Sequence, residues 1–245
     1  MSKPFYNIIF CIFGCDTIDR YRKEIFKVKE TWGSTDKAFI LFFLGEDGPL
    51  IGKNFIRLEN VENDYMSASY KQYGGLKYIY ENYNFNYVFI CGTDTYVLID
   101  NLIAYINEDP QISPDKPLVI GGHGDNRQIF NTSVHFFSGG GGIILTKATM
   151  DIIYPEIGTM QEEWTWLCFE NKYDTYTAAC DLSLCFFLKR HGIIFVNVCN
   201  RFFNCNYLGY YQDNSECCAK MVDIRTMISC HNMSLNDFDK LKGTK

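Results

Sequence analysis

The sequence predicts an α/β domain whose sheet is mixed but mostly parallel and is flanked by helices. Short apolar runs alternate with stretches of helical periodicity along most of the 245 residues, as strand–helix–strand units require. An apolar content of 47% and an aromatic content of 16% are enough for a large packed core. One apolar run ends in a polar turn that carries a carboxylate, and open α/β sheets bind ligands at such strand ends.

The individual elements follow from the periodicity of the apolar residues. Short apolar runs bounded by polar residues or glycine predict strands at 8–13, 39–43, 87–91, 118–120, 143–145 and 193–198. Longer amphipathic stretches predict helices at 20–31, 68–83, 102–107, 147–153 and 182–191. The C-terminal part of the chain is rich in Asn, Cys and Tyr. It predicts loops, a short sheet and a final helix over 235–241.

Charge and hydropathy narrow the class of protein. The net charge is −6, and because the basic residues are scattered, the chain shows no nucleic-acid footprint. An acidic protein that binds a nucleotide diphosphate needs a metal or a few local cations. No run reaches the roughly 18 apolar residues of a membrane span. The apolar run 6–15 lacks a small-residue cleavage site and is followed by Asp16, so we interpret it as the first strand and not as a signal peptide.

The cysteines indicate a reduced protein. There are eleven, an odd number, and no paired C-x-x-C set predicts a structural zinc site. Without a signal peptide most of them are expected to be free thiols. The expected location is therefore cytoplasmic, or the secretory lumen if the chain has been trimmed.

Asp94 is the first candidate site residue, because it follows the predicted strand 87–91 in the turn Gly92-Thr93-Asp94-Thr95. A carboxylate there suits Mg²⁺ or Mn²⁺, and these cations bridge diphosphates. The alternative is a simple turn, since Asp and Thr are both turn formers.

Two further segments have a chemical and a structural interpretation. Four glycines, 139–142, precede the predicted strand 143–145 and allow the backbone to approach a ligand closely, or form a tight turn. Asp181 stands before the helical run 182–190. The sequence favours an N-cap, and the residue also suits a general base that accepts a proton from a hydroxyl, a role compatible with capping if the helix start lines a pocket.

Four other side chains also leave two interpretations open. His231 is a candidate metal ligand paired in space with Asp94, or an ordinary half-buried imidazole. Lys71, at the start of the predicted helix 68–83, is a cation for a diphosphate or a solvated lysine. Trp164 and Trp166, expected in a loop before Asp181, stack on a sugar face or fill the core.

Taken in order, these segments resemble the fringe-like β-1,3-glycosyltransferases, and most closely their core-1 galactosyltransferase branch. The resemblance extends from about residue 8 to residue 241. It is carried by Lys29-Glu30-Thr31-Trp32-Gly33, the segment Tyr65 to Lys71, Gly92-Thr93-Asp94-Thr95-Tyr96-Val97, Ser138 with the glycines 139–142, Cys180-Asp181-Leu182, Ser229-Cys230-His231 and the vicinal pair Cys217-Cys218.

The resemblance implies a GT-A fold in one domain, 1–245, with a Rossmann-like nucleotide-sugar half (about 1–120) and an acceptor half that ends in the metal-ligand segment (about 121–245). It implies inverting transfer of a hexose or N-acetylhexosamine from a UDP-sugar to an acceptor sugar hydroxyl, with β-1,3 linkage and Mn²⁺ (or Mg²⁺). The implied roles are metal ligands for Asp94 and His231, catalytic base for Asp181, and donor contacts for Lys71, Thr93, Gly140 and Gly141.

The chain departs from the family pattern in three places. Gly92-Thr93-Asp94 retains only the last acid of the family's acidic triplet, and Cys180 replaces the acid before the base. The family's N-terminal membrane anchor is not seen. These changes leave an alternative function, a catalytically degenerate glycosyltransferase-like protein that binds a glycan or a partner without turnover.

Overall fold

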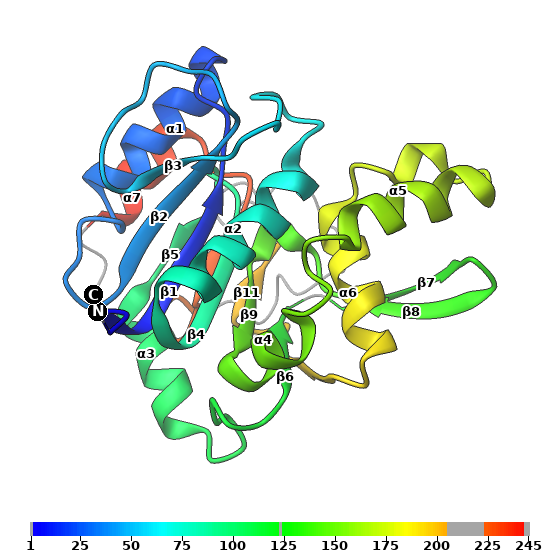
Figure 1. The fold of residues 1–245 in the computed structure, drawn as a ribbon. Helices are drawn as coiled ribbons and strands as arrows, with labels where there is room; N and C mark the ends of the chain where they lie inside the picture. Colours follow the sequence, from blue (N-terminus) through cyan, green and yellow to red (C-terminus); the bar gives the residue numbers. More distant parts are fainter. Residues whose placement is uncertain (1, 123, 205–222, 243–245) are drawn as a thin grey trace, which may run out of the picture.

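A seven-stranded sheet forms the centre of the protein, whose structure is a computed structural model that describes residues 2–122, 124–204 and 223–242 (Figure 1). The strand order is β10-β6-β9-β4-β1-β2-β3. The strands are β1 (Phe5–Phe13), β2 (Phe39–Leu44), β3 (Phe55–Arg57), β4 (Asn84–Cys91), β6 (Leu118–Gly121), β9 (Ile143–Thr146) and β10 (Ile194–Asn197). Only β9 is antiparallel to its neighbours, β4 and β6. The prediction of a mixed, mostly parallel sheet is therefore confirmed.

Helices cover both faces of this sheet (Figure 1). One face packs against α1 (Asp19–Glu30), α3 (Ile99–Glu108) and α7 (Leu235–Leu241), and the other against α2 (Ala68–Asn82), α4 (Lys147–Ile153), α5 (Met160–Glu170) and α6 (Cys180–Arg190). Alternate residues of β1 supply the two cores: Phe10 joins the first and Ile9 the second. Burial on both faces explains why the central strands are almost continuously apolar.

Two smaller sheets complete the fold. In the first, β12 (Ser229–Cys230) lies between β11 (Phe202–Phe203), to which it is parallel, and β5 (Tyr96–Val97), to which it is antiparallel. This pairing brings the C-terminal segment beside the turn that follows β4. In the second, β7 (Asp125–Ile129) and β8 (Thr132–Phe136) form a hairpin that projects from the body below α5 (Figure 1). Short 3₁₀ turns occupy Gly139–Gly141 and Asp174–Tyr176.

All the strands and helices predicted by periodicity are present, and the final helix has the predicted limits. The prediction that Trp164 and Trp166 lie in a loop is wrong, because both are in α5. Trp164 is buried against the core while Trp166 is 59% exposed. Large apolar side chains thus occur on both sides of α5, which hides the helical period that one apolar face would produce.

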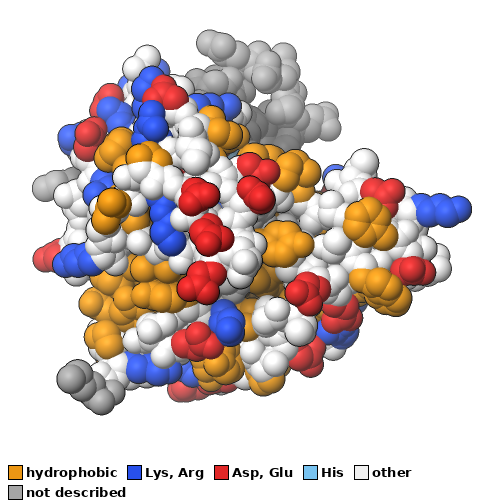
Figure 2. All heavy atoms as spheres, turned by 45° about the horizontal axis from the view of Figure 1, so that its top comes forward, with side chains coloured by type: hydrophobic (Ala, Val, Ile, Leu, Met, Phe, Trp, Pro, Cys, Tyr) orange, Lys and Arg blue, Asp and Glu red, His pale blue; other side chains and the backbone are white. Residues whose placement is uncertain are grey.

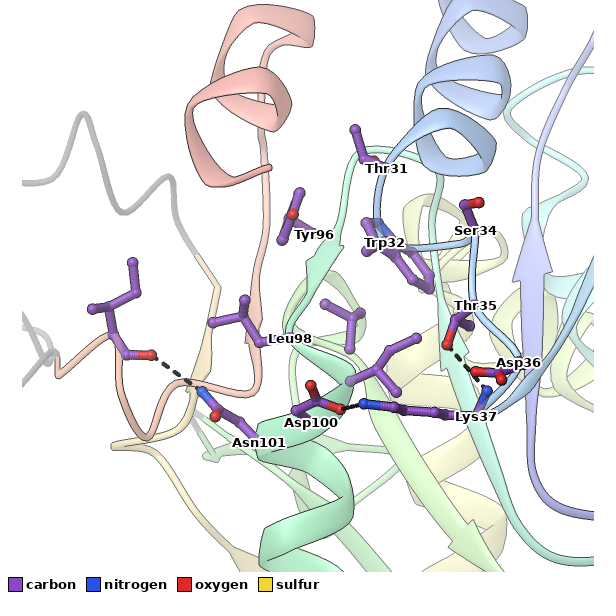
Figure 3. Close-up of a pocket in the computed structure, with 13 residues that line it drawn as sticks. Thr31, Trp32, Ser34, Thr35, Asp36, Lys37, Tyr96, Leu98, Asp100 and Asn101 are labelled. Carbon is purple, nitrogen blue, oxygen red and sulfur yellow. Dashed lines mark hydrogen bonds and ion pairs between the residues drawn. The ribbon is translucent and has the colours of Figure 1, made fainter. Parts of the chain in front are cut away.

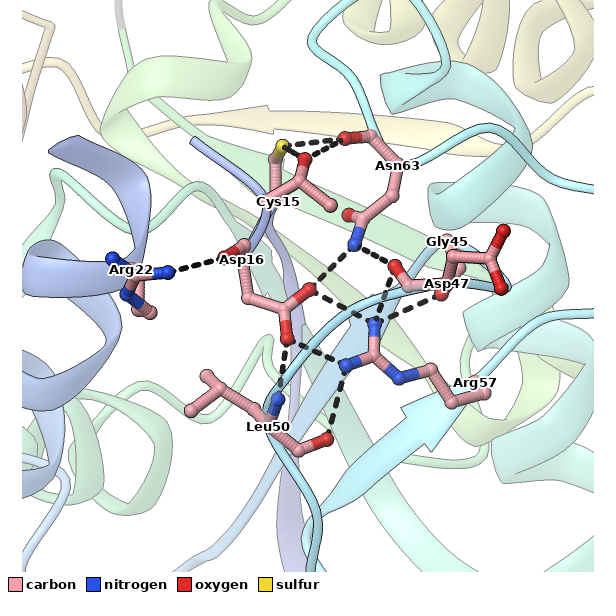
Figure 4. A network of polar contacts seen from close by, with 9 residues as sticks. Cys15, Asp16, Arg22, Gly45, Asp47, Leu50, Arg57 and Asn63 are labelled. Carbon is pink, nitrogen blue, oxygen red and sulfur yellow. Dashed lines mark hydrogen bonds and ion pairs between the residues drawn. The ribbon is translucent and has the colours of Figure 1, made fainter. Parts of the chain in front are cut away.

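A buried ion pair ties the end of β1 to the loops before α2 (Figure 4). The Asp16 carboxylate is fully buried and accepts hydrogen bonds from Arg57, the Leu50 amide and the Asn63 side chain. The Asn63 carbonyl in turn accepts hydrogen bonds from the Cys15 thiol and the Thr17 hydroxyl. This network fixes the segment that leads into Asp64 and Tyr65.

Seven cysteines of the described part are free thiols: Cys11, Cys15, Cys91, Cys168, Cys180, Cys185 and Cys199. Cys205 and the vicinal pair Cys217-Cys218 lie outside the described residues. No helix in the described ranges has the length and apolar character needed to cross a membrane.

Candidate active site

A pocket of about 480 Å³ opens at the carboxyl ends of β1 and β4. Asp94, Asp181 and His231 all line it, although they are far apart in the sequence. Asp94 comes from the turn after β4, Asp181 from the first turn of α6, and His231 from the residue after β12. In parallel α/β sheets this edge is the usual position of a ligand site.

The Asp94 carboxylate faces the His231 imidazole. Their Oδ2 and Nε2 atoms are 3.3 Å apart, and the other ring nitrogen, Nδ1, lies 3.3 Å from the Asn204 carbonyl oxygen. Burial disfavours the charged form of each group, but their mutual hydrogen bond and opposite charges outweigh it. The pKa of Asp94 is therefore lowered and that of His231 is raised.

The backbone between β5, β11 and β12 places these two side chains. The His231 amide donates to the Phe203 carbonyl, and the Met233 amide donates to the Asp94 carbonyl. The carbonyl of Asn204 orients the imidazole by accepting a hydrogen bond from Nδ1–H, which leaves Nε2 directed at Asp94. Metal-binding histidines are commonly oriented by this kind of contact.

The glycine run makes room for His231. A Cβ on Gly140 would lie 2.3 Å from the His231 Nδ1, whereas one on Gly141 would meet nothing closer than 3.6 Å. Gly142 has a φ of +88°, and its Cβ would collide with Phe89. Gly140 lines the pocket and Gly141 does not. Position 140 therefore requires glycine because a side chain there would collide with the His231 imidazole. The sequence alone does not show this contact.

Asp181 is not the N-cap of α6. The helix begins at Cys180 with Ala179 at its N-cap, so the capping alternative is wrong. The Asp181 carboxylate instead accepts hydrogen bonds from the Leu182 amide at 2.8 Å and from the Gly139 amide at 3.0 Å. The contact with Gly139 ties the glycine turn to α6 and holds the carboxylate at the pocket wall.

The two remaining predicted donor contacts have other partners. Thr93 lines the pocket, but its hydroxyl donates to Glu24 Oε2 at 2.6 Å. Lys71 is only 1% exposed, so the solvated-lysine alternative is wrong. Its ammonium donates to the Asp64 carbonyl at 2.6 Å, behind the pocket wall, and burial lowers its pKa. The structure does not bring Lys71 to the pocket surface.

A second, larger cavity of about 630 Å³ lies between the end of α1, β5 and the start of α3 (Figure 3). Two of its polar side chains are paired with protein atoms: the Trp32 indole donates to the Thr95 carbonyl at 3.0 Å, and Lys37 pairs with Asp100 at 2.5 Å. None of its described lining residues is a histidine. We therefore take the smaller pocket as the candidate active site, because Asp94, Asp181 and His231 converge there.

Asp94 and His231 are the side chains that could hold a metal ion. Within the described ranges, no cluster of three or more His, Cys, Asp and Glu residues forms a closed metal site. A pair of ligands still fits a cation such as Mg²⁺, which keeps several waters and binds substrate phosphates through its remaining positions. Asp94 and His231 therefore suit a metal ion whose remaining coordination positions are filled by water and by the phosphates of a substrate.

Several solved structures share this fold, whereas no protein-family model and no curated protein sequence matches the chain. A glycosyltransferase involved in glycosylation of the major capsid of PBCV-1 has 14% identity and a TM-score of 0.50, over 96% of this chain and 98% of its own. The galactosyltransferase LgtC, in complex with donor and acceptor sugar analogues, also has 14% identity and a TM-score of 0.50, over 97% and 95% of the two chains. The apo glycosyltransferase GlyE of Streptococcus pneumoniae has 12% identity and a TM-score of 0.55, over 94% of this chain and 55% of its own.

These likenesses establish the class of fold. The protein has the GT-A fold of glycosyltransferases, as the sequence motifs predicted. At this identity the likenesses extend to the fold alone. The fringe-like resemblance is carried by the sequence motifs.

Proposed function

We propose that the protein is a metal-dependent glycosyltransferase that moves a sugar from a UDP-sugar to an acceptor hydroxyl. The observation that carries the proposal is the convergence of Asp94, His231 and Asp181 on one pocket at the strand ends of a GT-A fold. The three residues come from three separate motifs that are far apart in the sequence.

Each side chain has a role that its surroundings support. Asp94 and His231 would hold Mn²⁺ or Mg²⁺, which when bound stabilises charge on a departing diphosphate. Asp181 would accept the proton of the attacking hydroxyl, since its carboxylate lines the pocket and is oriented by two backbone amides. Inversion, a hexose or N-acetylhexosamine donor and β-1,3 linkage rest on the fringe-like motifs.

A panel of UDP-sugars tests the proposal. The protein is incubated with each donor and Mn²⁺, with and without simple sugar acceptors, and released UDP is measured. Metal-dependent release from at least one donor is expected. Binding of UDP-sugars without release or transfer would favour the alternative function, a degenerate protein that binds glycans.

We predict that Asp94→Ala abolishes the dependence of UDP affinity on Mn²⁺, because the substitution removes one of the two ligands that we propose among the described residues. UDP binding is measured by calorimetry with Mn²⁺ and with EDTA. Asp100→Ala, which removes an equal charge from the second cavity, is the control and should retain the wild-type dependence. If UDP affinity is the same with and without Mn²⁺ in the wild type, the metal role of Asp94 is wrong.

A matched glycine pair tests the placement of His231. Gly140→Ala should displace the imidazole from Asp94 and lower Mn²⁺ affinity by about 10- to 100-fold, the usual cost of disturbing the surroundings of a ligand. Gly141→Ala adds the same methyl group where space exists and should bind Mn²⁺ like the wild type. Equal Mn²⁺ affinities of the two variants would contradict this role of Gly140.

A further inference from the structure

The charge around the pocket is unfavourable for a diphosphate. Asp64, Asp94 and Asp181 line the pocket, and of its described lining residues only Arg20 is a lysine or arginine. Figure 2 turns the top of Figure 1 forward, and acidic side chains gather across the middle of that face. An anionic ligand therefore needs positive charge inside the pocket, from a metal or from the protein.

Arg20 has free donors at this position. It lies in the first turn of α1, and its side chain is 67% exposed. Its Nε donates to Glu24 Oε1 at 3.0 Å, and its terminal nitrogens have no hydrogen bond to any residue of the described ranges. Burial alone would raise the pKa of Asp94. The contact with His231 lowers it instead, and the positive charge of Arg20 adds to that lowering. The planar guanidinium can present two parallel donors to a phosphate.

Glu24 connects Arg20 to the turn that carries Asp94. The Glu24 side chain is only 5% exposed, and its second oxygen accepts the hydroxyl of Thr93 at 2.6 Å. An acid at position 93, as in the acidic triplet of the resembled family, would oppose Glu24 with a like charge. Thr93, which stands in place of that acid, supplies a hydrogen-bond donor to Glu24 instead. It can therefore lie beside the Glu24–Arg20 ion pair without repulsion.

We propose that Arg20 binds the diphosphate of the donor and that Glu24 and Thr93 position its guanidinium for this contact. The inference rests on the proposed use of a UDP-sugar and adds a positive charge from the protein to that of the metal. It follows that part of the affinity for UDP is independent of the metal. Glu24 and Thr93 are positioning residues, because they act through Arg20.

The test measures binding of UDP and of pyrophosphate by calorimetry, with Mn²⁺ and with EDTA. Arg20→Met should weaken both ligands by about 10- to 100-fold under both conditions, the usual effect of losing hydrogen bonds to a charged group. Lys23→Met removes the same charge from the same helix, where Lys23 pairs with Asp19, and should bind like the wild type. Thr93→Val should weaken UDP by about 2- to 10-fold, and should add nothing to Arg20→Met in the double variant.

The outcomes separate this inference from the proposed function. Wild-type affinity in Arg20→Met overturns the role of Arg20 while the proposed function stands. A full additional loss from Thr93→Val in the Arg20→Met background overturns the positioning role. Absence of UDP and pyrophosphate binding by the wild type overturns both proposals. Should Arg20→Met fail to fold, Arg20→Lys retains the charge without the fork, and its wild-type affinity would equally contradict bidentate binding.

Discussion

Asp181→Asn is expected to reduce sugar transfer by about 10²- to 10⁴-fold, the usual contribution of a general base, while UDP and Mn²⁺ still bind. An amide cannot accept the proton of the acceptor hydroxyl. The substitution is nearly isosteric, and the amide oxygen can still accept the hydrogen bond from the Gly139 amide, although the NH₂ group cannot accept the one from the Leu182 amide. The expected result is therefore a folded protein with an intact donor site and little transfer.

Three measurements make this prediction specific to the base. Transfer rate, UDP affinity and melting temperature are compared in the wild type, Asp181→Asn and Asp100→Asn. Asp100 is also an acid in the first turn of a helix, α3, but it lies in the second cavity, so its variant should transfer at the wild-type rate. A wild-type transfer rate in Asp181→Asn would show that the base assignment is wrong.

Arg57→Met is expected to cost about 3–5 kcal/mol of the free energy of unfolding, because it leaves the Asp16 carboxylate buried without its ion-pair partner. Asp16 is fully buried, whereas the Arg57 side chain is 25% exposed. Arg225→Met is the matched control, since Arg225 pairs with Asp223 at the surface with 84% exposure of its side chain. A loss for Arg57→Met no larger than for Arg225→Met would contradict the role of the network.

The pH dependence follows from the pKa of Asp16. Burial opposes ionisation, but the Arg57, Leu50 and Asn63 contacts outweigh it, so the folded-state pKa lies below the unfolded value of about 3.9. The wild type thus gains stability above that value and loses it as the pH falls through the folded pKa. Without Arg57 burial dominates, and the penalty grows as the pH rises. The difference between the two proteins, measured by urea unfolding, should be largest at neutral pH, and adding Asp16→Asn to Arg57→Met should recover part of it.

Local patterns were sufficient for most of the fold. The central strands, which are buried on both faces and so are almost continuously apolar, and the helices with one buried face were predicted with nearly their observed limits, as for α7 over Leu235–Leu241. The hairpin β7–β8 and the helix α5 were missed. The strand β7 has four exposed residues out of five, and α5 has apolar side chains on two sides. In neither case does burial leave a simple period in the sequence.

By itself, the sequence determined the α/β class, the order of the main elements and the three motifs that contain Asp94, Asp181 and His231. Only the tertiary structure decided which side chains share a pocket. It brought the three together, left Lys71 behind the pocket wall, and linked Arg20 through Glu24 and Thr93 to the turn that carries Asp94. The physical reason is that hydrophobic periodicity reports only which face of an element is buried. The partner of a polar group depends on how distant segments pack, as β5 and β12 do here.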